Sequence, residues 1–596
     1  MLKRTCTCGD PRKNNSAETI TLSGWVNTYR DQGKGLVFID LRDRYGMTQV
    51  VFDAEDSPAE VMDIGTTLRR EDVITVKGVV RIRDGKPNEK LETGEVELVA
   101  QEIEVINRTA KLPILPDDHD ADKIGEEHRL KYRYIDLRRP NMQKILKLRH
   151  QITQFTRNFF ANNDFLEIET PLLITPTPEG ARDFIVPSRH QAGQWYALPQ
   201  SPQIFKQILM VAGCDKYLQI CKCLRDEDPR ADRQAEFTQI DLEMSFVEQD
   251  DILSIMSEFA TGLYKDVGGI DLGDLPRMSW KDAMNHYGSD RPDTRFDLKL
   301  QDITEIAAKT DFKVFNEVIS TGGVVKAMRV PGGAEKLSRK KTDALAEVAK
   351  TYGAGGLPVV KYQGGEFVTG VAKFVEPIKN KLVSTLGLED GDIVMFGVGS
   401  YRVACTALGE VRLAVAKELE LIPEGIFKGL WVIDFPMFDW NEESRRWVSE
   451  HHPFTAPLAS HLDILESDPG NCLSSGYDLV INGAEVGGGS IRIHSPEVQA
   501  KVFGLLGLSA EEAEEKFGFL LNALRFGAPP HGGVAFGLDR LVMMMVGTDN
   551  IRDVIAFPKT QTGADLMCEA PGAADPNQLK ELGIIIREPV DSTIQE

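Results

Sequence analysis

The sequence predicts a multidomain protein of the α+β class, and three observations support this. A chain of 596 residues is longer than one hydrophobic core usually supports. Strand-like runs crowd residues 18–107, and an amphipathic helix pattern follows at residues 145–159. From residue 289 to 428, glycine-rich turns alternate with strands and with helices rich in Lys and Glu. Polar motifs lie on both sides of this last stretch, so we interpret it as an inserted α+β domain, called the insert below.

The first domain is predicted from five short runs with strand character: TITLSGWV, GLVFIDL, TQVVF, DVITVKGVVRI and EVELVAQEIEVI. Gly, Asp and Asn separate these runs. Such a set is typical of a small Greek-key barrel of the OB type, whose strand face can hold single-stranded nucleic acid. A purely structural barrel would show the same pattern. We predict a barrel domain over residues 1–108 and, from its Pro, Asp and charged residues, a linker over 109–142.

Composition limits the possible partners. The formal net charge of −22 argues against non-specific nucleic-acid binding, which needs an excess of Lys and Arg, so any such contact must be local. The sequence lacks the ~18 consecutive apolar residues that a membrane-spanning helix requires, and its start lacks the apolar region of a secretory signal. We expect a cytoplasmic location with no membrane partner. The 8 cysteines are scattered, so we expect them to be reduced.

A polar strand face is predicted at residues 236–246, EFTQIDLEMSF, where apolar and polar residues alternate. The polar members are Gln239, Asp241, Glu243 and Ser245. A solvated edge of an antiparallel sheet would show the same alternation.

A charged segment, CLRDEDPRADRQAEF, comes just before that strand. Arg225 and Glu227 lie two residues apart at a strand end, and Gln234 follows in the loop. Alternation places the first two on one side, where a guanidinium can hold a phosphate and a carboxylate can face a metal or an adenine edge. A surface charge run could have the same composition.

Residues 475–494, SGYDLVINGAEVGGGSIRIH, predict two strands joined by a glycine-rich bend. Asp478 and Glu485 lie on the first part and Arg492 on the second. Carboxylate oxygens suit Mg²⁺, which binds carboxylates together with substrate phosphates. Arg492 lies between two isoleucines and therefore points to the polar face, where it can clamp a carboxylate.

A strand followed by a helix is predicted at residues 531–547, HGGVAFGLDRLVMMMVG. The first helical turn carries Gly537 and Arg540, and helix N-termini favour phosphate. The VMMM run fits a buried core. The sequence contains no G-x-x-x-x-G-K-[ST] loop, so ATP would not be held in the P-loop manner.

Taken together, these segments resemble motifs 2 and 3 of the class II aminoacyl-tRNA synthetases, and FLEIETPLL resembles motif 1, the dimer-forming element. A closer resemblance, to the bacterial aspartyl-tRNA synthetases, covers essentially the whole chain. It rests on TPEGARDF, ALPQSPQIFKQ, KCLRDEDPRADRQAEFTQID, HHPF, NGAEVGGGSIRIH and FGLDR, in this order.

The resemblance implies an N-terminal OB-fold that reads the anticodon and a catalytic domain on an antiparallel sheet, in two parts at residues 143–288 and 429–596. The insert, 289–428, would be of the kind shared with amidotransferase subunits. The protein would be a homodimeric ligase that activates L-aspartate with ATP and Mg²⁺ and transfers it to tRNA. Because the catalytic motifs lie outside the insert, we expect adenylate formation not to need it.

The resemblance also implies roles for individual residues. The residues expected to hold aspartate are Glu179, Ser201, Gln203, Lys206, Arg225, Asp241, His451 and Arg492. Among them, Lys206 and Arg492 would neutralise the side-chain carboxylate of the substrate. The residues expected to hold ATP are Arg225, Asp226, Glu227, Gln234, Glu485, Gly537, Leu538, Asp539 and Arg540. Arg225 and Arg540 would be the catalytic pair, and Asp478 and Glu485 would bind Mg²⁺.

In the barrel, Phe38 and Gln49 match family positions that stack on and read an anticodon base. Gln32 stands where selective members tend to carry Leu and relaxed members His. A glutamine both donates and accepts hydrogen bonds, and Gly85 would leave room beside it. These two residues favour charging of both the aspartate and the asparagine tRNA.

Two alternatives remain open. An asparaginyl or lysyl relative shares the barrel and the motifs, but Lys206 with Arg492 suits an anionic substrate. A non-catalytic tRNA-binding paralogue could keep the fold, but Arg225, Glu485 and Arg540 are all present.

Overall fold

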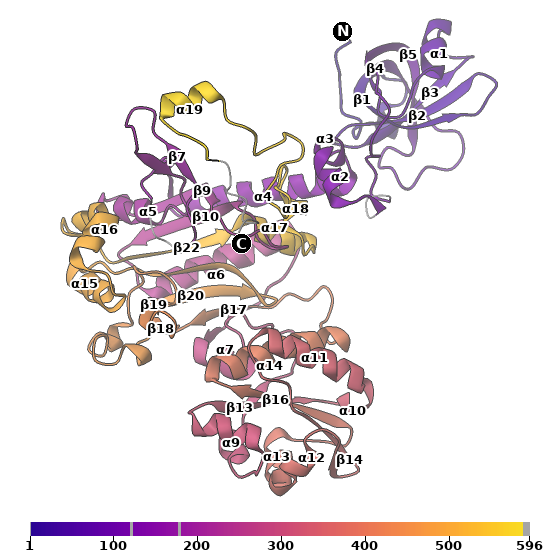
Figure 1. The fold of residues 1–596 in the computed structure, drawn as a ribbon. Coiled ribbons are helices and arrows are strands. Elements are labelled where there is room, and N and C mark those ends of the chain that lie inside the picture. The colour runs from indigo at the N-terminus through magenta and orange to yellow at the C-terminus, as the bar shows by residue number, and fades with distance from the viewer. Residues whose placement is uncertain (1, 120–122, 177–179, 588–596) are drawn as a thin grey trace, which may run out of the picture. The chain divides into compact units, whose positions relative to one another are not determined.

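The computed structural model describes residues 2–119, 123–176 and 180–587. The chain divides into two compact units, Met1–Gln143 and Lys144–Glu596 (Figure 1). Each unit has its own sheets and its own buried core.

The smaller unit is built on a closed five-stranded barrel with the strand order β1-β2-β3-β5-β4. Its strands are β1 (Thr19–Asp31), β2 (Leu36–Arg42), β3 (Met47–Asp53), β4 (Val73–Ile82) and β5 (Val96–Asn107). The strands β3 and β5 pair in parallel and the other neighbours antiparallel. Apolar residues from every strand fill the barrel, the helix α1 (Ala59–Thr66) contacts β3 and β5, and a short helix, η1 (Lys13–Asn15), precedes β1. The predicted OB-type barrel is confirmed.

The stretch predicted as a linker contains two short helices, α2 (Glu126–Lys131) and α3 (Arg133–Asp136). It is tied to the barrel by ion pairs: Arg138 lies 3.0 Å from Glu71, and Arg70 lies 3.1 Å from Asp117. This stretch therefore belongs to the compact smaller unit, whereas the bounds 1–108 and 109–142 stay a prediction.

The larger unit is organised around an eight-stranded sheet with the order β11-β17-β20-β21-β22-β10-β9-β6. Its strands are β6 (Leu166–Glu167), β9 (Lys216–Leu224), β10 (Glu236–Ser245), β11 (Arg277–Ser279), β17 (Gly429–Ile433), β20 (Gly476–Ile481), β21 (Ala484–Ile491) and β22 (His531–Gly537). The six central strands are antiparallel, and only the short edge strands β11 and β6 pair in parallel. The predicted antiparallel sheet is confirmed.

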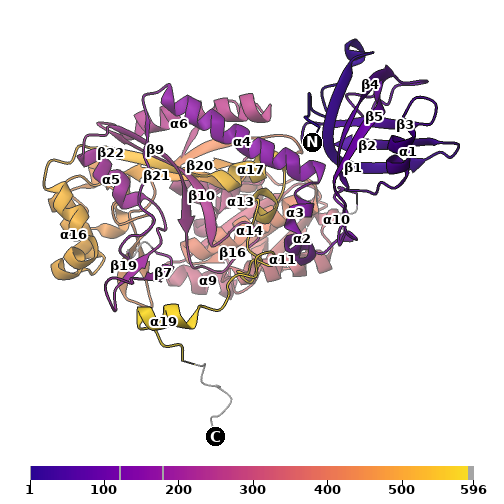
Figure 2. The same cartoon turned by 90° about the horizontal axis from the view of Figure 1, so that it is seen from above.

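One face of this sheet is covered by two long helices, α4 (Pro140–Ala161) and α6 (Gln249–Gly268) (Figure 2). Phe155 and Phe160 of α4 contact Phe259 of α6, whose ring centroid lies 5.3 Å from that of Phe536 in β22. Large buried aromatic rings stabilise such a layer through both area and geometry. The apolar side chains of the strands thus pack against these two helices. The polar side chains of the same strands lie on the opposite face of the sheet.

The larger unit contains further elements outside the insert. They are β7 (Ile185–Pro187), β8 (Trp195–Ala197), α5 (Gln203–Val211), α7 (Trp280–Tyr287), β18 (Phe438–Asn441), β19 (Arg446–Ser449), η4 (Ala459–His461), η5 (Pro469–Asn471), α15 (Pro496–Leu505), α16 (Ala510–Leu524), α17 (Leu538–Val546), α18 (Ile551–Val554) and α19 (Pro576–Leu582). The helices α5, α15 and α16 enclose an apolar cluster with Phe454.

The insert contains a second sheet, five-stranded and antiparallel, with the order β12-β13-β16-β14-β15. Its elements are β12 (Leu300–Asp302), α8 (Thr304–Ala307), α9 (Lys313–Ser320), β13 (Val324–Val330), α10 (Gly333–Lys336), α11 (Arg339–Thr351), β14 (Val359–Gln363), β15 (Glu366–Val368), α12 (Ala372–Val375), η3 (Glu376–Ile378), α13 (Lys379–Leu386), β16 (Asp392–Gly399) and α14 (Tyr401–Glu418). Two separate apolar clusters lie against this sheet, and α14 also packs on α7 (Figure 1). The predicted inserted α+β domain is confirmed as a fold.

The glycine-rich segment differs from the prediction. The turn between β20 and β21 is formed by Asn482 and Gly483, both with positive φ, whereas the glycines at 487–489 lie inside β21. A Cβ at Gly489 would come within 1.9 Å of the carbonyl oxygen of Gly533, so the close approach of β22 requires glycine there. Glu485 consequently lies on the second strand, not the first.

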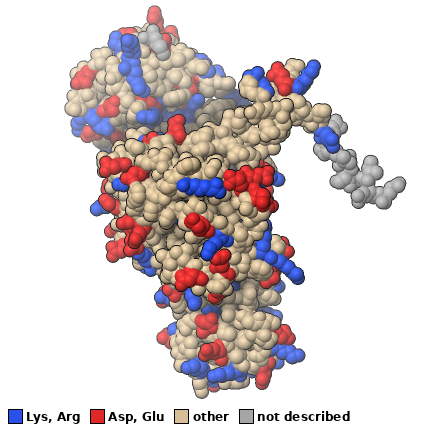
Figure 3. All heavy atoms as spheres, turned by 90° about the vertical axis from the view of Figure 1, so that its left-hand side faces the viewer, with Lys and Arg blue, Asp and Glu red and all other residues tan. Residues whose placement is uncertain are grey.

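Charges of both signs are mixed on the surface of the larger unit. On the face drawn in Figure 3, Lys and Arg alternate with Asp and Glu, and the described residues form no continuous basic band. Among the described residues, no helix combines the length and apolar character needed to cross a membrane.

Candidate active site

A cavity of about 600 Å³ opens on the polar face of the eight-stranded sheet. Strands β10, β20, β21 and β22 form its floor, and the loops around them form its walls. The predicted site residues that line it are Ser201, Gln203, Arg225, Glu227, Gln234, Asp241, His451, Asp478, Glu485, Arg492, Gly537, Asp539 and Arg540. Residues distant in the sequence therefore meet in one place.

Two cations and two carboxylates form a buried cluster at one end of the cavity. The Arg492 guanidinium donates from Nε and Nη2 to the two oxygens of Glu243, at 3.0 and 3.2 Å. Lys206 Nζ donates to Asp241 Oδ1 at 2.8 Å and lies 3.2 Å from Glu243 Oε2. Ser490 Oγ accepts from Arg492 Nη1 at 2.7 Å. Alternation along β10 explains the arrangement, because Asp241 and Glu243 share the polar face of that strand.

The pKa values within this cluster follow from burial and pairing. Burial raises the pKa of Glu243, but Arg492 and Lys206 outweigh burial, and the carboxyl stays below its ordinary pKa. For Asp241 burial dominates, and its pKa is raised although Lys206 opposes the shift. Arg492 remains fully protonated because Glu243 more than offsets the lowering of its pKa by burial.

Several buried polar atoms that line the cavity have no protein partner within the described ranges. They are Gln203 Nε2, Arg225 Nε, Asp241 Oδ2, His451 Nε2 and His452 Nε2. An unsatisfied buried polar group costs about 1–3 kcal/mol, so such groups are rare without a ligand or water. An acceptor on Asp241 beside donors on Gln203 and Arg225 suits a small zwitterion with an ammonium and a carboxylate.

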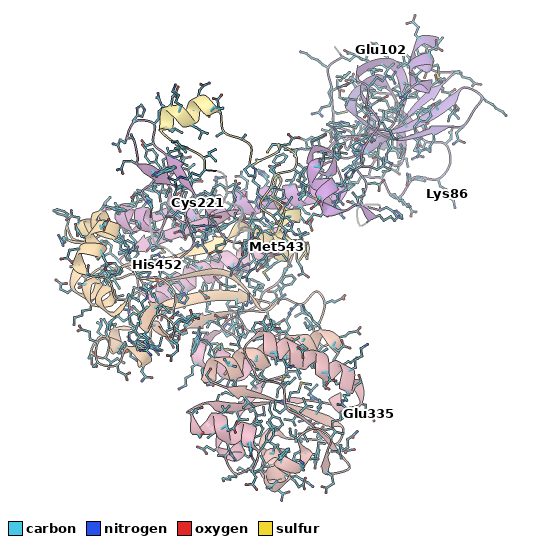
Figure 4. The ribbon with its side chains drawn as sticks, in the orientation of Figure 1. Lys86, Glu102, Cys221, Glu335, His452 and Met543 are labelled. Atoms are coloured by element: carbon cyan, nitrogen blue, oxygen red, sulfur yellow. The ribbon has the colours of Figure 1, made fainter. Side chains whose placement is uncertain are left out.

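His451 and His452 form one wall of the cavity. Burial, with a further contribution from Arg492, lowers the pKa of His451 to about 4 and that of His452 to about 3. The His451 ring stands edge-on to Phe435, with centroids 4.3 Å apart. Figure 4 shows His452 beside the eight-stranded sheet. Both imidazoles are neutral at neutral pH and contribute hydrogen bonds, not charge.

The other end of the cavity presents arginines and an amide. Arg225 lies over the ring of Phe237, with its guanidinium carbon 5.2 Å from the centroid, and Gln234 Nε2 is buried without a partner among the described residues. Arg540, in the first turn of α17, donates to the backbone oxygen of Glu485. Asp539 accepts from Arg149 at 2.6 Å and from the Thr238 amide at 2.8 Å, so both of its oxygens already anchor the start of α17.

Asp478 and Glu485 approach each other across β20 and β21. A Cβ at Gly488 would lie 2.3 Å from Asp478 Oδ1 and 3.3 Å from Glu485 Oε1, so glycine keeps the space between the carboxylates open. Burial and the neighbouring Glu485 raise the pKa of Asp478 well above its ordinary value, which marks a place that favours a cation. The described residues contain no group of three or more acidic, His or Cys side chains that would enclose a metal. Two carboxylates fit Mg²⁺, which completes its shell with phosphates and water.

Some predicted site residues lie elsewhere. Lys206 is fully buried behind Asp241 and does not line the cavity, and Leu538 is also buried. Asp226 pairs with Arg182 at 2.5 Å. Glu179 lies outside the described residues.

The anticodon candidates lie in the smaller unit. Phe38 is half-buried in β2, and Gln49 in β3 donates to Glu97 Oε2 at 2.7 Å and accepts from Arg30 at 3.1 Å. Gln32 is exposed, and Gly85 has a positive φ with open space around it.

Sequence reasoning missed several residues of the site, among them Glu243, which binds Arg492, and His452, Asp290 and Glu450, which line the cavity. Alternation already placed Glu243 on the polar strand face, and His452 adjoins His451, so both carried a signal. Asp290 and Glu450 belong to no recognised motif.

Comparisons with known proteins agree with this geometry. The family described as tRNA synthetases class II (D, K and N) matches residues 125–561, and the OB-fold nucleic acid binding domain matches residues 20–106. An aspartate–tRNA(Asp/Asn) ligase of Desulfatibacillum aliphaticivorans is 50% identical over 98% of this chain and 98% of its own length. The enzyme of the same name from Bacillus subtilis strain 168 is 49% identical over 99% of this chain and 100% of its own.

Among solved structures, asparaginyl-tRNA synthetase from Pyrococcus horikoshii complexed with asparaginyl-adenylate has a TM-score of 0.59 at 17% identity. The match covers 94% of this chain and 99% of that one, and at this identity it supports the fold alone. The family matches confirm the resemblance inferred from the motifs. The chain belongs to the class II tRNA synthetases of the D, K and N group.

Proposed function

We propose that this protein is an aspartate–tRNA ligase, which forms aspartyl-adenylate from L-aspartate and ATP and transfers the aspartyl group to tRNA. The observation that carries the proposal is the buried cluster at one end of the cavity. Arg492 and Lys206 supply two positive charges there, and Asp241 offers an unpartnered oxygen. The names of the relatives at 49–50% identity support the same activity.

Aspartate differs from the substrates of the asparagine and lysine relatives by a second carboxylate. Arg492 lines the cavity and would receive that carboxylate, with Lys206 behind it adding charge. Asp241 Oδ2 would accept from the ammonium, and Gln203, with the neutral His451, would donate hydrogen bonds. A charge-assisted hydrogen bond contributes about 1.5–3 kcal/mol, so the cluster favours aspartate over the neutral amide.

ATP would occupy the arginine-lined end. Arg225, held over Phe237, would contact the α-phosphate, and Arg540 would contact the outer phosphates near the start of α17. Glu227 and Gln234 would bind the adenosine part. Asp478 and Glu485 would hold Mg²⁺, which neutralises charge on the phosphates when bound.

For activation, the protein mainly has to position aspartate and ATP. The substrate α-carboxylate oxygen attacks the α-phosphorus, pyrophosphate leaves, and Arg225 stabilises the charge that develops on the phosphoryl oxygens. The terminal ribose hydroxyl of the tRNA afterwards attacks the mixed anhydride and AMP leaves. No protein nucleophile is needed in either step.

Charging of total tRNA with radiolabelled amino acid tests this proposal against the non-catalytic alternative. We expect aspartyl-tRNA to form in the presence of ATP and Mg²⁺, and to stop forming when EDTA removes the metal. A protein that binds tRNA but yields no aspartyl-tRNA would contradict the proposal.

We further propose that the asparagine tRNA is also charged. The exposed Gln32 and the open space at Gly85 leave room for either last anticodon base, and the two relatives above carry (Asp/Asn) in their names. Charging of separately transcribed aspartate and asparagine tRNAs is the test. A preference of a hundredfold or more in kcat/KM for the aspartate tRNA, about 2.7 kcal/mol, would rule out relaxed recognition.

A homodimer and a cytoplasmic location complete the proposal. Leu166, Leu172 and Leu173, in the segment that resembles motif 1, are more than half exposed, and contiguous exposed apolar residues favour a protein interface. The proposed substrates, ATP and tRNA, place the reaction in the cytoplasm. Light scattering after gel filtration should give twice the chain mass of 66.2 kDa.

A further inference from the structure

We propose that Arg402, on the insert, is a positioning residue that holds the Glu450–His452 wall of the aspartate pocket in place. The expected effect on aspartate kinetics rests on the proposed function. The expected effect on the position of the wall does not. It also revises the expectation that adenylate formation does not need the insert.

The wall is held to its surroundings by few hydrogen bonds, one of which runs from the Thr455 amide to the His452 oxygen at 2.9 Å. It follows the hairpin of β18 and β19, and the amide of Glu450 donates to the Met437 oxygen at 3.3 Å. The imidazole of His452 accepts from the Phe454 amide through Nδ1 at 3.4 Å, which is a long hydrogen bond. The Nε2 atoms of His451 and His452 have no protein partner in the described part of the chain. None of these contacts involves the Glu450 side chain, which is left to be held from outside the wall.

Arg402 supplies a strong contact to this wall. Its Nη2 donates to both oxygens of Glu450 at 3.0 Å, and its Nη1 lies 3.3 Å from Asp439 Oδ2. Asp439 lies in β18 and Glu450 directly after β19, so one guanidinium joins the two strands of the hairpin at its open end. Contacts from two nitrogens of one guanidinium to two carboxylates restrain geometry more than a single ion pair does.

This pair differs from an ordinary surface salt bridge. The Arg402 side chain is 51% exposed but that of Glu450 only 17%, and burial, with Asp439 and Asp290 nearby, raises the pKa of Glu450 although Arg402 opposes the shift. Exposed pairs contribute little because water screens them, whereas an unpaired buried carboxylate is costly. Loss of Arg402 would leave Glu450 unpaired, next to His451 and facing two other carboxylates. The wall would then shift toward solvent.

The start of α14, which carries Arg402, is well anchored. It lies in the first turn of α14, where the Tyr401 hydroxyl donates to Asn285 Oδ1 at 3.1 Å. Lys326 of the insert sheet donates to the same Asn285 oxygen at 2.9 Å. Asn285 belongs to α7, outside the insert. The start of α14 is thus fixed on the body that carries the pocket, and Arg402 reaches the wall from a defined position.

The test compares Arg402→Gln with Arg329→Gln. Arg329 pairs with Asp392 at 2.6 Å inside the insert, so its variant perturbs the insert without touching the wall. Hydrogen–deuterium exchange of the free protein should show faster uptake over residues 446–454 in Arg402→Gln only. This readout needs no activity and remains decisive even if aspartate is not the substrate.

Pyrophosphate exchange provides the second readout. Arg402→Gln should raise KM for aspartate by about threefold to tenfold while kcat and KM for ATP change less than twofold. Arg402→Lys should recover part of the loss, and Glu450→Gln combined with Arg402→Gln should add little to either single change. Unchanged deuterium uptake over 446–454 in Arg402→Gln would overturn the proposal. So would an equal rise in KM in Arg329→Gln, or a parallel loss of kcat and melting temperature.

Discussion

At the scale of single residues, Arg492 is held by two partners within the protein, Glu243 and Ser490. Glu243 holds its Nε and Nη2 from within the protein, while the face of the guanidinium toward the cavity is left for a ligand. Glu243 therefore orients Arg492 and balances its charge before any substrate arrives. This preorganisation lowers the cost of binding an anion in a buried site.

Substitution of Arg492 should separate binding from stability. Arg492→Lys keeps a charge but loses the forked contact, and we expect kcat/KM for aspartate to fall by about tenfold to hundredfold with little change in melting temperature. Arg492→Leu should also destabilise the protein, because it leaves the buried Glu243 carboxylate without its partner. The expected loss in the free energy of unfolding is about 3–5 kcal/mol. Pyrophosphate exchange and thermal melting measure the two effects. An Arg492→Lys variant with the kcat/KM of the wild type would contradict this account.

The buried His452 should make the protein sensitive to acid. Its pKa is about 3 in the folded state against 6.5 in the unfolded chain, so the unfolded chain binds the proton first as pH falls. Stability is therefore complete above pH 6.5 and declines below it, by up to about 1.4 kcal/mol per pH unit.

His452→Gln removes this titration, and its melting temperature should fall less than that of the wild type between pH 7 and pH 5. His190→Gln, at an exposed position, should follow the wild type. Equal losses in all three proteins would show that His452 does not titrate as described.

At the scale of elements, β21 carries the closest packing of the site. Its glycines let β22 approach and keep space beside Asp478. The sequence motif indicated a bend here because glycine runs usually mark turns, but the backbone turns at Asn482 and Gly483 instead. Local composition did not distinguish a turn glycine from a glycine needed for strand contact, since the second depends on a neighbouring strand distant in sequence.

Gly489→Ala tests this packing. The new Cβ would overlap the Gly533 oxygen, and overpacking costs about 1–3 kcal/mol, so the melting temperature of a unit of this size should drop by about 1–3 °C. Gly504→Ala is the control, since Gly504 lies in the last turn of α15 with open space around it, and alanine there should be neutral or stabilising. Similar melting of the two variants would contradict the assigned role of Gly489.

Alternation and motif spacing were enough to predict the barrel strands, the polar face of β10 and the strand-to-helix turn before Arg540. These features depend on short-range patterns. Asp290 and the Arg402–Glu450 pair were not predictable, because each depends on where the insert meets the catalytic sheet. Lys206 was expected to reach the substrate, but it lies behind Asp241, and its depth could not be read from a helical pattern.

At the scale of the whole molecule, every described residue that lines the cavity belongs to the larger unit. The barrel has its own closed sheet and core. A chain that starts at Pro140, where α4 begins, should therefore still catalyse aspartate-dependent pyrophosphate exchange, while tRNA charging should fall sharply without the barrel. Loss of exchange in a folded protein of this length would show that the barrel is needed for activation.

The central claim is that the buried cluster selects aspartate. Pyrophosphate exchange measured separately with aspartate, asparagine and lysine tests it most directly, since the assay reports adenylate formation without tRNA. The account predicts a kcat/KM for aspartate at least about a hundredfold above that for asparagine, because the amide cannot replace the charged contact to Arg492. Comparable exchange with asparagine or lysine would contradict it.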